Sequence, residues 1–171
     1  MLVKAGLTRD DGSVYAFGRL ALFAPTGSPL EVDERLEGLA RLVKTGRVTR
    51  FAVANPAVAP YGRAAAAVLR TRGLWDAIQP RLVLGDTVAQ TAQFATSGNA
   101  VGGLVAYSLV LAPGFASRGS HAVIAERDHP PLRQRMVLLK QASPAVVQFY
   151  DYLSGESART VLRRYGYGVP Q

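Results

Sequence analysis

Two turns in this sequence present backbone N–H groups in positions that could bind an anion. In the first turn, residues 55–64 follow the apolar run 51–54, which predicts a buried strand, and lead into an alanine-rich stretch typical of a helix. Pro60 suits the first helical position, where a missing N–H costs nothing, and the N–H groups of Tyr61 and Gly62 then point out of the helix start. Proteins of the α/β class hold anions at such positions, although many strand-to-helix turns have no ligand.

The second turn repeats this arrangement further along the chain. A short apolar run at residues 82–84 ends at Gly85, and either Asp86 or Thr87 could cap the helix that begins near Val88. The first N–H groups of this helix form a second candidate anion site. The sequence therefore predicts two helix starts that could act together on one anion.

Other chemistries have little support in the residue types. The chain has no cysteine, and its two histidines have no acidic partners at metal-ligand spacing, so we expect no site for a metal cation. A Gly-x-Ser-x-Gly motif is also absent. The carboxylates are interpreted as surface or capping residues, and we therefore do not expect an enzyme.

The net charge of +8 would suit a nucleic acid as partner. The basic residues are scattered, however, so we expect an ordinary basic surface whose field favours a small anion and no nucleic-acid partner. No apolar run reaches the roughly 18 residues of a membrane span.

The predicted elements alternate between strands and helices joined by short links, which is typical of an α/β fold with a largely parallel sheet. Before the first turn, residues 14–23 are expected to form a strand and residues 32–44 an amphipathic helix. After the second turn, strands are expected over residues 103–106, 122–125 and 136–139, and helices close the chain.

Two proline-containing breaks, near residues 25 and 127, are candidate hinges. The segment 26–126 would then be one complete lobe that carries both turns, whereas residues 1–25 and 127–171 would together form part of another lobe. Two strands that cross between two lobes are the chain connectivity typical of a binding protein that closes about a hinge.

The two turns belong to a larger set of short motifs. The motifs are NPxxxPYGRAA at 55–65, GLWD at 73–76, GDTVAQ at 85–90, GNA at 98–100, HPPLRQ at 129–134, FYDYL at 149–153 and RYGY at 164–167. No single motif is decisive, but the set runs through nearly the whole chain, and in its order it resembles the periplasmic molybdate-binding proteins of bacterial molybdate ABC transporters.

The resemblance implies a fold like that of the type II periplasmic binding proteins, and an oxyanion held by hydroxyls and backbone N–H groups without cofactor or metal-cation ligands. Two of the family's ligand positions fall on the backbone N–H groups of Tyr61 and Val88. A third position, a tyrosine hydroxyl in some members, falls on Ala106. The supporting turn and cap positions are Pro60, Gly62, Asp86, Thr87 and Ala106.

The resemblance further implies a monomer in the periplasm that binds molybdate or tungstate and delivers it to a permease in the inner membrane. The chain departs from the family at its start, because the loops that carry the hydroxyl ligands, and a signal peptide, have no counterpart in it. We therefore expect an incomplete first lobe and weakened binding. Two alternatives stay open: an oxyanion-sensing effector module of a transcription regulator, and a nonfunctional remnant.

Overall fold

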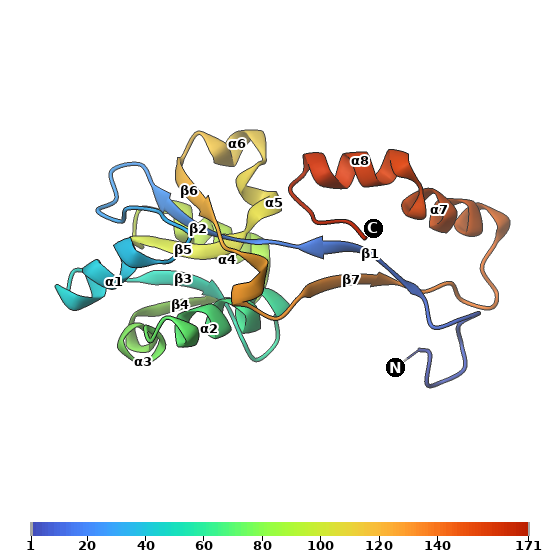
Figure 1. Cartoon of the computed structure of the whole chain (residues 1–171), viewed down its shortest axis with the longest axis horizontal. Helices are drawn as coiled ribbons and strands as arrows, with labels where there is room; N and C mark the ends of the chain where they lie inside the picture. The colour runs from blue at the N-terminus through green and yellow to red at the C-terminus, as the bar shows by residue number, and fades with distance from the viewer. Residues whose placement is uncertain (1, 171) are drawn as a thin grey trace. The chain divides into compact units, whose positions relative to one another are not determined.

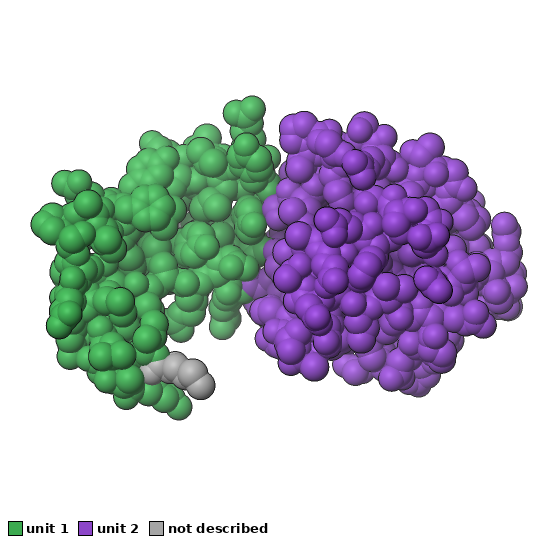
Figure 2. Space-filling view, turned by 180° about the vertical axis from the view of Figure 1, so that it is seen from behind, with its two compact units in different colours: residues 1–18, 133–171 green, residues 19–132 purple. Residues whose placement is uncertain are grey.

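The computed structural model describes residues 2–170, and these form two compact units (Figures 1 and 2). The larger unit is Arg19–Leu132, and the smaller unit comprises the described residues of Met1–Gly18 and Arg133–Gln171. The unit boundaries therefore differ by several residues from the breaks expected near residues 25 and 127. The reason is that the strand ending at Pro25 is hydrogen-bonded on both sides within the larger unit. The correspondence of these units with two lobes stays a prediction.

The larger unit contains a five-stranded sheet in the order β4-β3-β5-β2-β6. The strand β3 runs parallel to both β4 and β5, whereas β2 is antiparallel to β5 and β6. The α/β class expected from the sequence is confirmed, with one reversed strand in the sheet. The strand bounds are β2 Leu20–Pro25, β3 Phe51–Ala54, β4 Leu82–Gly85, β5 Gly102–Ala106 and β6 Gly119–Val123.

Helices cover both faces of this sheet and bury two separate apolar clusters. Leu39, Val68 and Ile78 bring the first three helices into the larger cluster, and Ala95 and Val110 bring two later helices into the smaller cluster. The first group is α1 Glu37–Lys44, α2 Pro60–Thr71 and α3 Trp75–Ile78, followed by the 3-10 turn η1 Gln79–Arg81. The second group is α4 Val88–Thr96, α5 Tyr107–Val110 and α6 Pro113–Ala116, and η2 Glu126–Asp128 follows β6.

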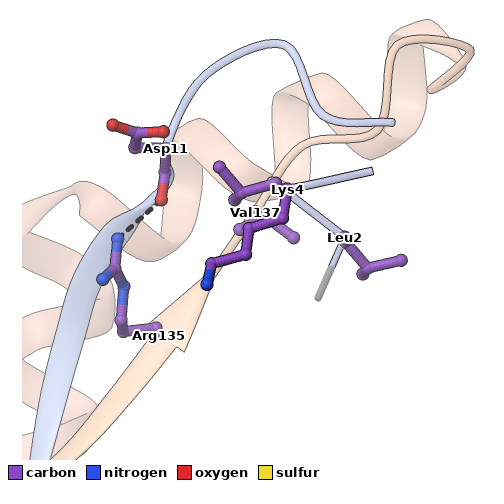
Figure 3. Close-up of a pocket in the computed structure, with 6 residues that line it drawn as sticks. Leu2, Lys4, Asp11, Arg135 and Val137 are labelled. Carbon is purple, nitrogen blue, oxygen red and sulfur yellow. Dashed lines mark hydrogen bonds between the residues drawn. The ribbon is translucent and has the colours of Figure 1, made fainter. Parts of the chain in front are cut away.

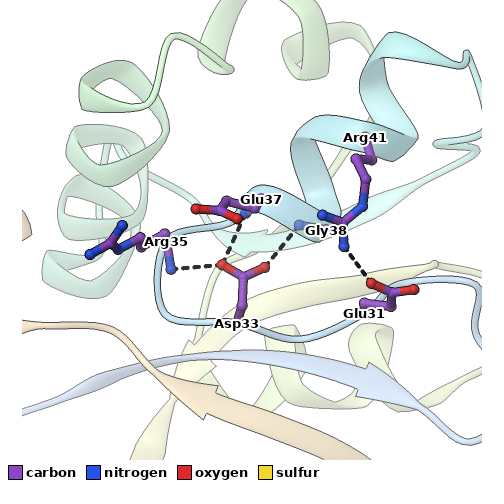
Figure 4. A network of polar contacts seen from close by, with 6 residues as sticks. All are labelled: Glu31, Asp33, Arg35, Glu37, Gly38 and Arg41. Carbon is purple, nitrogen blue, oxygen red and sulfur yellow. Dashed lines mark hydrogen bonds and ion pairs between the residues drawn. The ribbon is translucent and has the colours of Figure 1, made fainter.

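The helix expected over residues 32–44 begins only at Glu37, so the first part of that prediction was wrong. The carboxylate of Asp33 accepts hydrogen bonds from the N–H groups of Arg35, Glu37 and Gly38 at 2.8, 3.0 and 2.8 Å (Figure 4). These bonds cap the helix start and hold the preceding residues in a turn. Leu36 is fully buried and has a φ of 62°, in the left-handed region. A right-handed helix cannot include a residue in this conformation, so α1 cannot extend toward the N-terminus beyond Glu37.

Asp33 gives a testable pH dependence. Burial raises the pKa of Asp33, but the hydrogen bonds from Gly38, Glu37 and Arg35, together with the charge of Arg41, outweigh it and hold the pKa below its ordinary value. Because the folded-state pKa is lowered, this stabilisation is present above the unfolded-state value of about 3.9 and is lost as the pH falls through the folded-state pKa.

We expect Asp33→Asn to lower the free energy of unfolding at pH 7 by about 1 kcal/mol, because the amide loses the negative charge and the second acceptor oxygen, which accepts from the Gly38 N–H. The difference from the parent protein should shrink when urea unfolding is repeated below about pH 4. Glu31→Gln is the matched control, because Glu31 pairs with Arg41 only at the exposed surface and should change little. A difference that is equally large at pH 3 and pH 7 would contradict the assignment.

The smaller unit is built on a two-stranded sheet, in which β1 Ser13–Gly18 pairs with β7 Leu132–Met136. A strand was expected over residues 136–139, but the observed strand β7 lies earlier in the chain and ends at Met136. Beyond it, Leu139 forms only an isolated bridge with Thr8. Two helices follow, α7 Pro144–Ser154 and α8 Glu156–Arg164. None of the helices in the described part of the chain is long and apolar enough to span a membrane.

Candidate anion-binding site

The two predicted turns meet at one edge of the large sheet. Ala54 and Gly85 end the parallel strands β3 and β4 as register partners, and the backbone N–H of Asn55 donates to the Gly85 carbonyl at 2.8 Å. The helices α2 and α4 start a few residues beyond these strand ends (Figure 1). Their first-turn N–H groups, and the positive ends of their dipoles, therefore lie beyond the carboxyl edge of neighbouring strands, where open α/β sheets bind ligands.

The turn into α2 is fixed by hydrogen bonds to Asn55. Its carbonyl accepts from the N–H groups of Val58 and Ala59 at 3.2 and 2.8 Å, and its side-chain oxygen accepts from Ala57 at 3.0 Å. Ala59 at the N-cap has no side-chain acceptor to offer the first turn, and Pro60 occupies the first helical position as expected. The helix start is thus held in place by the preceding turn and not by a capping side chain.

Two glycines let both helices sit directly on the strand ends. A Cβ atom at Gly62 would overlap the carbonyl oxygen of Ala54, and one at Gly85 would lie 2.5 Å from the Oγ1 of Thr91. Real Cβ atoms essentially never approach other atoms this closely. Gly62 and Gly85 are therefore packing residues that set how near each helix start comes to its strand.

The start of α4 has a reciprocal cap, which decides between Asp86 and Thr87. Thr87 is the N-cap, and its Oγ1 accepts from the Gln90 N–H at 3.1 Å, while the Gln90 Oε1 accepts from the Asp86 N–H at 2.8 Å. Across the described chain, no acceptor is found for the N–H groups of Val88 and Ala89. These two donors are available to a ligand.

A side-chain contact joins the two turns. The Asn55 Nδ2 donates to the Asp86 Oδ1 at 3.3 Å, so each helix start is tied to the other by residues far apart in the sequence. Sequence reasoning named Asp86 but missed this role of Asn55 and the capping role of Gln90. The Thr-x-x-Gln spacing was a readable signal for Gln90, whereas the contact of Asn55 depends on the register of β3 and β4.

The third position, Ala106, ends β5, which lies beside β3 in the sheet. Its side chain is 2 % exposed and has no polar group. The neighbouring Tyr107 packs against the smaller apolar cluster, and its ring lies 5.6 Å from that of His121 and 5.7 Å from the Arg19 guanidinium. Tyr107 is therefore occupied by packing contacts on the face covered by α4 and α5.

No group of His, Cys, Asp or Glu side chains within residues 2–170 is arranged to hold a metal ion. The site therefore consists mainly of backbone N–H donors at two helix starts, with Asp86 as the nearby carboxylate that is already bonded to Asn55. Such an arrangement can bind an oxyanion without any proton transfer or bond making.

A family model and individual relatives both place this chain among bacterial solute-binding proteins. Residues 1–168 match the family model described as bacterial extracellular solute-binding protein. The molybdate-binding protein ModA of Azotobacter vinelandii is 37% identical over 168 residues, which is 97% of this chain and 64% of that protein. ModA of Rhodobacter capsulatus is 34% identical over 155 residues, 90% of this chain and 58% of that protein.

A solved structure agrees with these relatives. The periplasmic molybdate-binding protein of Azotobacter vinelandii superposes with a TM-score of 0.82 at 26% identity, covering 99% of this chain and 73% of that one. The fold expected from the resemblance is thereby confirmed. This chain spans less than two thirds of the length of the two curated relatives described above.

Proposed function

This chain belongs to the bacterial extracellular solute-binding protein family, and we propose that it binds the molybdate oxyanion for a molybdate ABC transporter. The observation that carries the proposal is the pair of helix starts, α2 and α4, on the neighbouring parallel strands β3 and β4. The relatives named molybdate-binding proteins support the choice of anion. Membership of a solute-binding family argues for binding without catalysis.

In this proposal the ligand is held by electrostatics and hydrogen bonds alone. The backbone N–H of Val88 donates to one oxygen and the backbone N–H of Tyr61 to another, and both helix dipoles favour the dianion. Asn55, Pro60, Gly62 and Thr87 position the two helix starts. Tungstate has the same shape and charge as molybdate, so we expect both anions to bind.

The wider role follows from the same family. We propose that the protein acts as a monomer in the periplasm and passes its anion to the transporter permease. The net charge of +8 favours the approach of a small dianion over long distances. No cofactor takes part, because holding and releasing an oxyanion needs none.

The expected affinity of residues 1–171 alone is modest. Micromolar to nanomolar binding requires about −8 to −12 kcal/mol. One helix start contributes roughly 0.3–1 kcal/mol, or about 2 when partly buried, and one charge-assisted hydrogen bond about 1.5–3 kcal/mol before association entropy is subtracted. Because the curated relatives are considerably longer, we expect them to add further ligand contacts and bind more tightly.

Isothermal titration calorimetry with sodium molybdate tests this proposal. We expect saturable one-to-one binding that is weaker than that of the Azotobacter vinelandii protein measured alongside, similar for tungstate and undetectable for the monovalent anion nitrate. Binding of nitrate as strong as that of molybdate would show a non-specific basic surface instead. No heat with either dianion at millimolar concentration, from a protein with a folded circular dichroism spectrum, would reject the function, and submicromolar binding would reject the expected weakness.

A further inference from the structure

A pocket of about 440 Å³ lies at the amino edge of the parallel strands, away from the two helix starts. Three connecting segments line it, around residues 25–29, 47–49 and 98–101. These segments adjoin the end of β2 and the starts of β3 and β5. Because β3 is only four residues long, about 13 Å separates this edge from the edge that carries the candidate anion site.

Several hydrogen-bond donors of this pocket have no acceptor among the described residues. They are the guanidinium of Arg47, the hydroxyls of Thr26 and Thr49, and the backbone N–H of Gly27. Ser28 differs from them, because its hydroxyl donates to the Val101 carbonyl at 2.5 Å and accepts from the Leu30 N–H at 3.1 Å. Ser28 therefore fixes the turn, and the other donors are available to a ligand.

The pocket is positively charged, and no carboxylate neutralises it. The three segments that line it contain no acidic residue. Arg50 lies three residues beyond Arg47, and the Arg118 carbonyl accepts from the Thr26 N–H at 2.8 Å, which brings a further arginine to this edge. Glu31, the nearest acidic residue after the first segment, already forms an ion pair of its own. The pocket therefore favours an anion.

A pocket in the smaller unit does not share these properties. It has a volume of about 640 Å³ and is lined in part by Asp11 and Arg135 (Figure 3). The Arg135 guanidinium donates to the Asp11 carbonyl at 2.6 Å, and the Asp11 carboxylate adds a negative charge. The arginine of that pocket already has an acceptor, so the Arg47 pocket is the better candidate for an anion.

An apolar pocket of about 310 Å³ adjoins the Arg47 pocket, and Ala100 lines both. Apolar atoms make up most of its lining, to which Val83 and the half-buried Phe94 contribute. Both volumes are in the range typical of small-molecule sites and exceed what a bare oxyanion needs. The two pockets together suit a ligand with an anionic group and a flat apolar part.

The surroundings favour a small molecule over a protein partner. Protein interfaces are usually centred on exposed aromatic and other apolar side chains. Among the described residues of the larger unit, only Val58 and Leu84 are large, apolar and exposed, and neither lines these pockets. A protein would therefore find no apolar anchor at this edge.

The donors favour a phosphate group over a carboxylate. A phosphate monoester has three terminal oxygens that accept hydrogen bonds, whereas a carboxylate has two. The planar guanidinium of Arg47 can bind two phosphate oxygens, and the hydroxyls of Thr26 and Thr49 can donate to the third.

We propose that these two pockets form a binding site for a small organic phosphate with an aromatic ring, of the class of nucleoside monophosphates. Arg47, Thr26 and Thr49 hold the phosphate group, and the ring lies in the apolar pocket against Phe94. The site is separate from the proposed molybdate site and does not rest on it.

Isothermal titration calorimetry of the full chain with adenosine monophosphate tests this proposal. We expect saturable one-to-one binding with a Kd below about 1 mM, at least about tenfold weaker binding of inorganic phosphate, and no detectable binding of adenosine. The affinity should be the same with and without added molybdate. Phe94→Leu keeps an apolar side chain in the smaller cluster, and it should weaken binding of adenosine monophosphate but not of ribose 5-phosphate.

Arg47 variants separate a built site from a general basic surface. Arg47→Gln should weaken binding of adenosine monophosphate at least about tenfold, and Arg47→Lys should weaken it less, because lysine keeps the charge but lacks the planar fork. Lys44→Gln is the matched control, since Lys44 is exposed, lies outside the pocket and loses the same charge. It should change the affinity less than about twofold.

Four results would overturn the proposal. The first is no saturation by adenosine monophosphate at about 5 mM, from a protein with a folded circular dichroism spectrum. The second is binding of adenosine as tight as that of its monophosphate, because the phosphate would then not be recognised. The third is displacement by molybdate, which would place the nucleotide at α2 and α4. The fourth is an equal loss for Arg47→Gln and Lys44→Gln. Molybdate binding is judged by its own titration.

Discussion

Replacing Val88 with proline is expected to weaken molybdate binding by about ten- to a hundredfold while α4 stays folded. Proline removes only the N–H, and Val88 is the first residue of α4, where proline is well tolerated. The residue before a proline must be extended, and Thr87 already has φ −125° and ψ 159°. A hydrogen bond to a charged group contributes about 1.5–3 kcal/mol, which corresponds to this loss of affinity.

Val88→Ala is the matched control for this experiment, because it shortens the side chain and keeps the N–H donor. Calorimetry should give an affinity for Val88→Ala close to that of the parent chain, and circular dichroism should show the same helix content in all three proteins. Unchanged affinity in Val88→Pro would remove this N–H from the ligand set. Equal losses in both variants would mean that the side chain and not the N–H is responsible.

Gly62→Ala is expected to lower the free energy of unfolding by about 1–3 kcal/mol, as overpacking substitutions typically do. Alanine usually stabilises a helix relative to glycine by up to about 1 kcal/mol, so helix propensity alone would predict that Gly62→Ala raises the free energy of unfolding. The overlap of the new Cβ with the Ala54 carbonyl decides the outcome, because both atoms belong to or adjoin rigid backbone. We also expect weaker molybdate binding, since the start of α2 must move away from β3.

Gly114→Ala is the control that separates the effect of helix propensity from the effect of close packing. Gly114 lies in α6, and nothing lies within 4 Å of the position its Cβ would take. Urea unfolding should therefore show Gly114→Ala to be neutral or slightly more stable than the parent chain. If both alanine variants changed stability in the same direction and by the same amount, close packing at Gly62 would not be the cause.

Local chemistry made the two strand-to-helix turns predictable. Pro60 and Gly85 mark the turns, and Thr87 precedes a helix with the spacing of a capping box. These signals act within a few residues and need no knowledge of the rest of the fold. The two anion-binding positions were therefore proposed from sequence motifs, and the structure brings the two helix starts to one sheet edge.

Features that depend on distant contacts were not predictable in the same way. The spacing of Leu36 and Leu39 suits a helix that begins at residue 32. The Asp33 carboxylate instead accepts hydrogen bonds from three backbone N–H groups, and the helix begins only at Glu37. The apolar run of β2 carries no sign of its direction, which is set by antiparallel pairing with β5 and β6. The bond between Asn55 and Asp86 likewise exists only because β3 and β4 are paired.

The donors proposed at positions 61 and 88 belong to the main chain, and this has an evolutionary consequence. Almost any side chain can replace Tyr61 or Val88 without removing the N–H groups that would bind the anion. A change of side chain at either position therefore keeps the proposed donor, although at position 61 it also alters packing, because Tyr61 packs against the larger apolar cluster. The substitution that selection should reject at position 88 is proline, which the fold accepts and the ligand does not.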